Sequence, residues 1–194
     1  MNATILPDGK VLATGGSSSS GFNDATNAVL AAEMWDPRTG LWSVMASNRV
    51  KRLYHSSALL LPDGRVLFAG GGRPRPTGGG TDNYNVEFYS PPYLFKGARP
   101  RITSAPNKVS YGHVFSVQTP DAASIASVTW VSISSVTHSF NMSQRFNKLS
   151  FAKASNAINI TAPSDRRIAT PGHYMLFLLN ANGVPSVAQI IQIT

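Results

Sequence analysis

Tyr54 and His55 are adjacent side chains of types that can bind a metal ion or move a proton. They lie in the stretch RLYHSSALLLPDGRVLFAGGG, which runs from Arg52 to Gly72. Because successive side chains of a strand point to opposite faces of its sheet, both can reach one ion only at a bend or at a strand end. The polar residues before the apolar run permit such an end. The alternative is structural, with His55 hydrogen-bonding to a neighbouring sheet and Tyr54 packing against it.

His138 is the second candidate, and it lies in the polar stretch SVTHSFNMSQRF at residues 135–146. A histidine among serine, threonine and asparagine is typical of a loop tip between two strands. Such a tip can extend into a cavity formed by another domain. We interpret His113, which begins a predicted strand, as a surface residue. We interpret His173, where a turn enters a long apolar strand, as a packing or capping residue.

An internal repeat predicts the elements that position the first candidates. LPDGKVLATGG (6–16) returns as LPDGRVLFAGG (61–71). Each copy contains a Pro-Asp-Gly turn, a β-branched strand and a glycine pair, which we expect where backbone approaches backbone too closely for a Cβ atom. Four-stranded units with such a repeat are typical of propeller blades. We therefore predict one complete blade over residues 3–46 and three strands of a second over residues 53–90.

The fold class that follows is all-β. After residue 101 the glycine pairs stop, and about seven short alternating segments predict an immunoglobulin-like sandwich. We expect propeller blades over residues 1–94 and the sandwich over residues 95–194. Two blades cannot close a ring and would expose unpaired strand edges, so the chain is expected to be a piece of a propeller or to associate with missing blades or with itself.

Composition excludes several classes of protein. The 194 residues carry a net charge of +8 and include no cysteine, which rules out disulfides and thiolate metal sites. The basic residues are scattered, and the loop at 70–80 carries two arginines without an aromatic platform, so we do not expect nucleic-acid binding. No apolar run is long enough for a transmembrane helix, and Pro7-Asp8-Gly9 interrupts any signal peptide.

Three motifs carry a resemblance to a known family. They are VKRLYHSSALLLPDGRVLFAGGG, VTHSFNMSQRF and PGHYMLFLLNANGVPSVAQIIQI. In order and wording they resemble the C-terminal part of galactose oxidase and glyoxal oxidase, the copper radical oxidases. The resemblance implies kelch-type blades followed by an E-set sandwich. It also implies that Tyr54 is the axial copper ligand and takes the substrate's hydroxyl proton, and that His55 and His138 are equatorial copper ligands.

The resemblance further implies a two-electron oxidation of a primary alcohol, aldehyde or carbohydrate, with O2 reduced to H2O2. In the family the radical resides on a tyrosine cross-linked to a cysteine, and this chain has no cysteine. We therefore expect the chain, as a C-terminal segment whose first repeat is cut at its first strand, to be inactive alone. The alternative is a non-catalytic carbohydrate-binding or interaction module built from a β-sandwich. The family resemblance implies a secreted or cell-surface protein.

Overall fold

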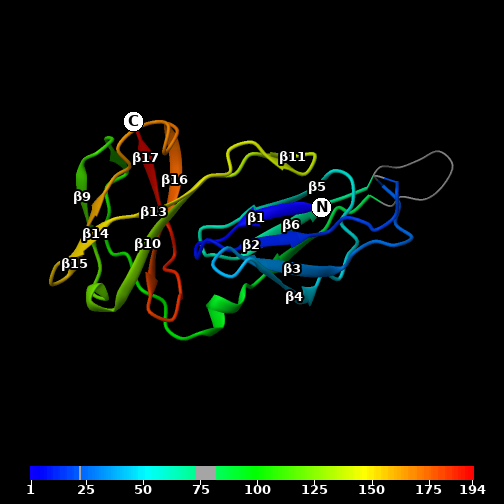
Figure 1. The fold of residues 1–194 in the computed structure, drawn as a ribbon, viewed down its shortest axis with the longest axis horizontal. Coiled ribbons are helices and arrows are strands. Elements are labelled where there is room, and N and C mark those ends of the chain that lie inside the picture. The colour runs from blue at the N-terminus through cyan, green and yellow to red at the C-terminus, as the bar shows by residue number, and fades with distance from the viewer. Residues whose placement is uncertain (22, 73–81) are drawn as a thin grey trace. The chain divides into compact units, whose positions relative to one another are not determined.

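The computed structural model describes residues 1–21, 23–72 and 82–194, and it is an all-β structure (Figure 1). The two arginines of the loop predicted at 70–80 lie outside the described residues. The chain forms two compact units that are not continuous in sequence. The first unit comprises residues 1–61, 65–89 and 134–144, and the second comprises residues 62–64, 90–133 and 145–194. The predicted domain division at residues 94 and 95 stays a prediction.

The first repeat forms a four-stranded antiparallel sheet in the order β1-β2-β3-β4. Alternate side chains of β1 are buried, which is the period-2 pattern of a half-buried strand. A tight turn joins β1 to β2, because Gly9 takes a φ of 83° and its N–H donates to the Leu6 carbonyl at 2.9 Å. The strands are β1 (Asn2–Ile5), β2 (Val11–Thr14), β3 (Ala31–Asp36) and β4 (Leu41–Ser47).

The second repeat forms a three-stranded sheet in the order β5-β6-β7. Every second residue of β5 is buried, as in the first sheet. The predicted four strands and three strands are thus confirmed, whereas their interpretation as kelch-type propeller blades stays a prediction. The strands are β5 (Ser56–Leu60), β6 (Val66–Gly70) and β7 (Val86–Tyr89).

A two-stranded hairpin from the C-terminal half belongs to the first unit. It consists of β11 (Val136–Thr137) and β12 (Phe140–Asn141). The hairpin contacts β1 and β5, and Figure 1 shows β11 beside β5. The Gln144 side chain that follows it accepts a hydrogen bond from the backbone N–H of Ile5 at 2.9 Å. These contacts explain why residues 134–144 group with the N-terminal sheets.

The second unit is the predicted sandwich, with a sheet ordered β13-β10-β16-β17-β8 and another ordered β14-β15-β9. Its core includes Trp130 stacked on Tyr174, with ring centroids 4.6 Å apart. The five-stranded sheet contains β8 (Lys108–Val109), β10 (Ile125–Ser132), β13 (Phe146–Leu149), β16 (Gly172–Asn180) and β17 (Gln189–Ile193). The other contains β9 (Val114–Gln118), β14 (Phe151–Lys153) and β15 (Ala157–Thr161).

Helical structure among the described residues is limited to two short 3-10 turns, η1 (Pro92–Phe95) and η2 (Ala122–Ser124). None of the helices in that part of the chain has the length and apolar character needed to cross a membrane.

Candidate metal centre

The side chains of Tyr54, His55 and His138 lie together in the first unit. The ring centroids of Tyr54 and His55 are 3.8 Å apart, and those of His55 and His138 are 5.0 Å apart. The Tyr54 and His138 centroids are 5.6 Å apart. The structure thus brings together all three residues that the sequence analysis selected, although His138 is separated from the other two by more than eighty residues.

The hairpin turn that carries His138 has an unusual sequence for its conformation. Thr137 pairs with Phe140 across the hairpin, so His138 and Ser139 form a two-residue loop. Their φ angles are 51° and 69°. Positive φ at both central residues defines a type I′ turn, for which Asn-Gly is the preferred sequence. The chain therefore has a histidine and a serine at two positions whose positive φ is sterically unfavourable for most residues that carry a Cβ atom.

His55 is held in the same left-handed region, with a φ of 64°. Within the described part of the chain, His55, His138 and Ser139 are the three residues other than glycine that have positive φ. Such conformations persist only where surrounding structure enforces them, and they are concentrated at functional sites. Two of the three strained residues are His55 and His138, whose imidazole rings lie edge to face.

The segment Lys51–His55, which we call the entry segment because it leads into β5, is held by backbone hydrogen bonds. The Arg52 carbonyl accepts from the Gly16 N–H at 2.8 Å, and the Tyr54 carbonyl accepts from the Gly72 N–H at 2.7 Å. These bonds join it to the glycines that follow β2 and β6.

The glycine pairs are required for this close approach. A Cβ atom on Gly15 would lie 2.5 Å from the Arg52 carbonyl oxygen, and one on Gly70 would lie 3.0 Å from the His55 carbonyl oxygen. Both glycines also have a φ of 68°. The expectation that these glycines mark close backbone contacts is therefore confirmed, and the contact partner is the segment that carries Tyr54 and His55.

Arg52 anchors the entry segment through its side chain, which is 2% exposed. Its Nη2 is 3.0 Å from the Glu87 carboxylate on β7, and its Nη1 donates to the carbonyls of Gly70 at 2.8 Å and Asn85 at 3.1 Å. Its Nε is buried without a hydrogen-bond partner. Sequence reasoning missed this residue, because a lone arginine beside a lysine resembles an ordinary surface charge.

The three side chains have donor atoms suited to one metal ion. Metal–imidazole nitrogen bonds are about 2 Å long, so two imidazoles that share an ion have ring centroids about 4 to 6 Å apart. The separation of His55 and His138 lies in that range. Thr137 Oγ1 is 2.7 Å from Nδ1 of His138, which leaves Nε2 of that ring for an ion. Imidazole and phenolate donors in a tetragonal set suit Cu(II).

The site is open, because His55 and His138 are exposed and Tyr54 is half-buried. No cluster of three or more histidine, cysteine, aspartate or glutamate side chains suited to a metal occurs in the part of the chain that the structure describes. The Tyr54 phenol, a third side chain with an oxygen donor atom, lies beside the two imidazoles. His113 and His173 are exposed residues of the second unit, which confirms that His113 is a surface residue.

The chain matches two protein-family models, which together span nearly its whole length. A family model described as "Glyoxal oxidase N-terminus" matches residues 1–93, and one described as "Galactose oxidase-like, Early set domain" matches residues 99–193. These matches define a two-part, all-β chain of the oxidase type. The chain belongs to the galactose oxidase and glyoxal oxidase family.

Individual proteins of this family are similar to nearly the whole chain. Galactose oxidase of Gibberella zeae is 35% identical over 200 residues, which cover 99% of this chain and 29% of that protein. "Aldehyde oxidase GLOX1" of Arabidopsis thaliana is 34% identical over 221 residues, which cover 99% of this chain and 35% of that protein.

A solved structure described as "Novel fungal alcohol oxidase with catalytic diversity among the AA5 family, in complex with copper" has a TM-score of 0.91 and 32% identity. The match covers 100% of this chain and 42% of that one. This chain therefore spans less than half the length of each of these relatives.

Proposed function

We propose that this chain is part of a copper radical oxidase and that Tyr54, His55 and His138 bind its copper ion. The observation that carries the proposal is the backbone strain at His55 and His138, whose rings lie 5.0 Å apart. Two imidazoles held together at the expense of unfavourable φ angles indicate a function that requires both. The copper complex among the solved relatives supports the choice of metal.

The proposed reaction oxidises a primary alcohol to an aldehyde, or a hydrated aldehyde to an acid. Two electrons and two protons pass to O2, which becomes H2O2. Copper, when bound, would supply one of the two one-electron redox groups that this two-electron oxidation needs, and the family's tyrosyl radical would be the other. His55 and His138 would orient the ion, with Thr137 fixing the ring of His138 through Nδ1. The Tyr54 phenolate oxygen would accept the proton of the substrate's hydroxyl group.

The chain alone is proposed to bind copper without completing this reaction. Its sequence contains no cysteine, so the tyrosine–cysteine radical cofactor of the family cannot form within it. The blades that would supply this cofactor are proposed to come from elsewhere in the complete protein. Secretion or attachment to the cell surface is proposed from the family.

Copper binding can be tested by titrating the chain with Cu(II) and recording EPR spectra. We expect one axial Cu(II) signal per chain and no H2O2 from small primary alcohols. The substitutions His55→Gly and His138→Gly each remove an imidazole and relieve the strain of a positive φ. Both variants are therefore expected to remain folded. Each should weaken copper binding at least 10-fold and change the nitrogen hyperfine pattern.

The matched control is His113→Ala, which removes an exposed histidine from the second unit and should leave the Cu(II) signal intact. Tyr54→Phe keeps the aromatic ring and removes only the hydroxyl group. The EPR parameters of bound Cu(II) should therefore change, while the couplings to the imidazole nitrogens remain. Identical spectra in the parent chain and in both glycine variants would contradict the proposal and favour the non-catalytic carbohydrate-binding or interaction module.

A further inference from the structure

The second unit carries most of the positive charge of the chain. Residues 62–64, 90–133 and 145–194 contain nine lysine and arginine residues against three aspartates, a net charge of +6 out of +8 for the whole chain. They contain no glutamate. The proposed copper ligands all belong to the first unit, so the copper chemistry does not use this charge. Such an excess of positive charge favours anionic partners.

A hollow of about 390 Å³ in the second unit brings two of these charges together. It is lined by residues 99–103 and 187–189, and we call it the sandwich hollow. Arg99 and Arg101 flank Pro100 in this lining, and a proline favours an extended backbone at the residue before it. No acidic side chain is among the lining residues. An anion in the sandwich hollow would therefore meet two guanidinium groups and no carboxylate in its wall.

The guanidinium of Arg99 is fixed before any ligand binds. Its Nε donates to the Pro185 carbonyl at 2.9 Å, and its Nη2 donates to the Ser186 carbonyl at 2.8 Å. Three of its five N–H groups make no further bond to the part of the chain that the structure describes. Burial lowers the pKa of Arg99, and the charge of Asp63 opposes this effect. A fixed, partly desolvated cation loses little entropy on binding an anion and gains a strong interaction.

Arg101 supplies a second cation, and two neutral side chains supply other polar groups. The Arg101 side chain is exposed and makes no ion pair or hydrogen bond with a described residue, although its backbone N–H donates to Asp121 at 2.9 Å. Thr103 Oγ1 donates to the Gln118 carbonyl at 3.1 Å, which leaves its oxygen free to accept. The Gln189 amide makes no side-chain bond within the described residues. These groups suit the hydroxyls of a ligand.

The rest of the lining selects among anions. Ile102 and Val187 are apolar, and Val187 is 54% exposed, so each can pack against an aliphatic ring. No aromatic residue lines the sandwich hollow, so a nucleobase would find no stacking surface there. A guanidinium can bind a carboxylate with two parallel hydrogen bonds. A carboxylate, several hydroxyl groups and an aliphatic ring together describe a uronic acid.

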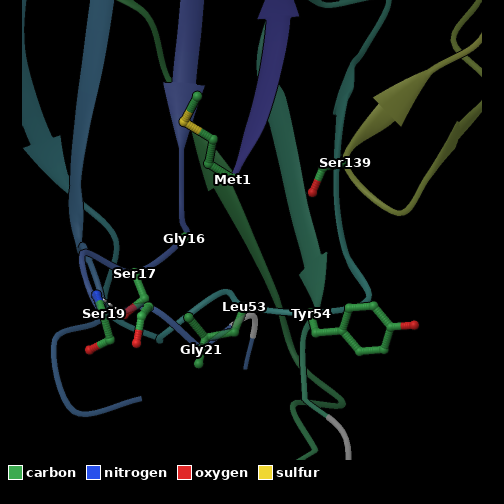
Figure 2. Close-up of a pocket in the computed structure, with 9 residues that line it drawn as sticks. Met1, Gly16, Ser17, Ser19, Gly21, Leu53, Tyr54 and Ser139 are labelled. Carbon is green, nitrogen blue, oxygen red and sulfur yellow. Dashed lines mark hydrogen bonds between the residues drawn. The ribbon is translucent and has the colours of Figure 1, made fainter. Parts of the chain in front are cut away.

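A hollow of about 340 Å³ beside Tyr54 in the first unit provides a contrast. Four serines line it (Ser17, Ser19, Ser20 and Ser139), and no charged side chain does. Figure 2 shows Ser17 and Ser19 near one another and Ser139 on a different segment, across from them. The two hollows are similar in size and differ in charge. A carboxylate would find ion-pair partners in the sandwich hollow and none in the lining beside Tyr54.

We infer that the sandwich hollow binds the carboxylated sugar units of an acidic polysaccharide, with Arg99 and Arg101 pairing with the carboxylate. Thr103 and Gln189 would bond to hydroxyl groups, and Val187 would pack against the C–H groups of the sugar ring. The remaining positive charge of the unit would attract neighbouring carboxylates of the same polymer. The inference goes beyond the proposed function and does not depend on copper.

The first test uses the copper-free chain and three probes at constant ionic strength: D-glucuronate, D-glucose and acetate. Binding is followed by shifts of the backbone amide signals of Ile102, Thr103 and Ala188 in ¹H–¹⁵N NMR spectra. Glucuronate should bind about 10-fold more tightly than either other probe, because it alone combines the carboxylate with the sugar hydroxyls. Glucose or acetate binding as tightly as glucuronate would overturn the inference.

A second pair of probes separates an acidic polysaccharide from nucleic acid. Trigalacturonate and a single-stranded DNA oligonucleotide of the same net charge are compared at the same ionic strength. Trigalacturonate should bind more tightly than glucuronate and more tightly than the DNA, and it should shift the same three amide signals. DNA binding as tightly as trigalacturonate would overturn the inference and favour a general polyanion surface.

Variants test the lining directly. Arg101→Gln removes an exposed charge that has no described partner, so the variant should fold and bind glucuronate about 10-fold more weakly. Lys148→Gln is the matched control, because Lys148 is an exposed cation of the same unit that does not line the hollow. Gln189→Met should weaken glucuronate binding roughly 2- to 10-fold and leave acetate binding unchanged. Equal losses in Arg101→Gln and Lys148→Gln, or no loss in either lining variant, would overturn the inference.

This inference and the proposed function fail independently. Copper signals that depend on His55 and His138, in a chain that does not prefer glucuronate, would overturn this inference and leave the proposed function standing. Glucuronate binding that depends on Arg101, in a chain whose copper spectra do not depend on the two histidines, would support this inference and overturn the metal centre.

Discussion

The two copies of the Leu-Pro-Asp-Gly repeat have nearly identical backbone conformations. Gly9 and Gly64 have φ angles of 83° and 81°, and Gly15 and Gly70 both have 68°. What differs is the atom that each glycine pair contacts. Gly15 faces the carbonyl oxygen of Arg52, whereas Gly70 faces that of His55. Both copies of the repeated sequence therefore hold the same segment, the entry segment Lys51–His55.

This comparison separates scaffold from chemistry. The repeat builds two similar sheets, whose glycine pairs both contact the entry segment. The entry segment itself carries Tyr54 and His55. The segment that ends at the left-handed His55 is thus held by two copies of a structural motif that contains no candidate ligand.

The largest effect is expected from breaking the glycine contact of the first copy. Gly15→Ala places a Cβ atom 2.5 Å from the Arg52 carbonyl oxygen and forces alanine into a positive φ. The strain of that φ and the overlap together should destabilise the fold by about 3–5 kcal/mol, measured by urea denaturation. Gly70→Ala, with its contact at 3.0 Å, should cost less.

Gly40→Ala provides the matched control, because Gly40 has a similar φ of 72° and no atom lies within 4 Å of its built Cβ. It should show only the conformational cost of about 1–2 kcal/mol. Equal destabilisation by Gly15→Ala and Gly40→Ala would mean that close approach to the entry segment contributes nothing.

An intermediate effect is expected from removing the Arg52 side chain, which anchors the entry segment to the sheet of the second copy. Arg52→Met removes the guanidinium that bonds to the Glu87 carboxylate and to two carbonyl groups, and it should destabilise the fold by about 2–4 kcal/mol. Arg38→Met is the control, because Arg38 pairs with Asp36 at the surface and is 81% exposed. Its denaturation midpoint should not change measurably. A similar loss in both variants would contradict a special role for Arg52.

The smallest effect is expected at the direct link between the two copies. Asn2 on β1 donates through Nδ2 to Ser56 Oγ at 3.1 Å, next to His55. Asn2→Ala should cost about 1 kcal/mol, because the lost hydrogen bond is partly offset by removing a buried amide oxygen that has no partner. Ser57→Ala, at a half-buried position of β5 next to Ser56, serves as control. A loss above about 3 kcal/mol would show that the two sheets depend on this bond far more than a single hydrogen bond allows.

Local sequence patterns were sufficient for much of the fold. The Pro-Asp-Gly turns, the alternation in β1 and β5 and the glycine pairs all follow from preferences that act over a few residues. They were not sufficient for the turn at His138 and Ser139, whose residue types do not favour the observed type I′ conformation. Nor did they predict the burial of Arg52, since burial depends on residues far away in sequence.

The sequence by itself determined the strands, the turns and the types of donor atoms available, because strand alternation, turn chemistry and side-chain chemistry are local properties. Only the tertiary structure decided that His138 lies 5.0 Å from His55 and that serines from two distant segments line one hollow. Such meetings depend on how a hairpin from the C-terminal half packs against β1 and β5. That packing is the sum of many weak contacts between segments remote in sequence, and no short pattern encodes it.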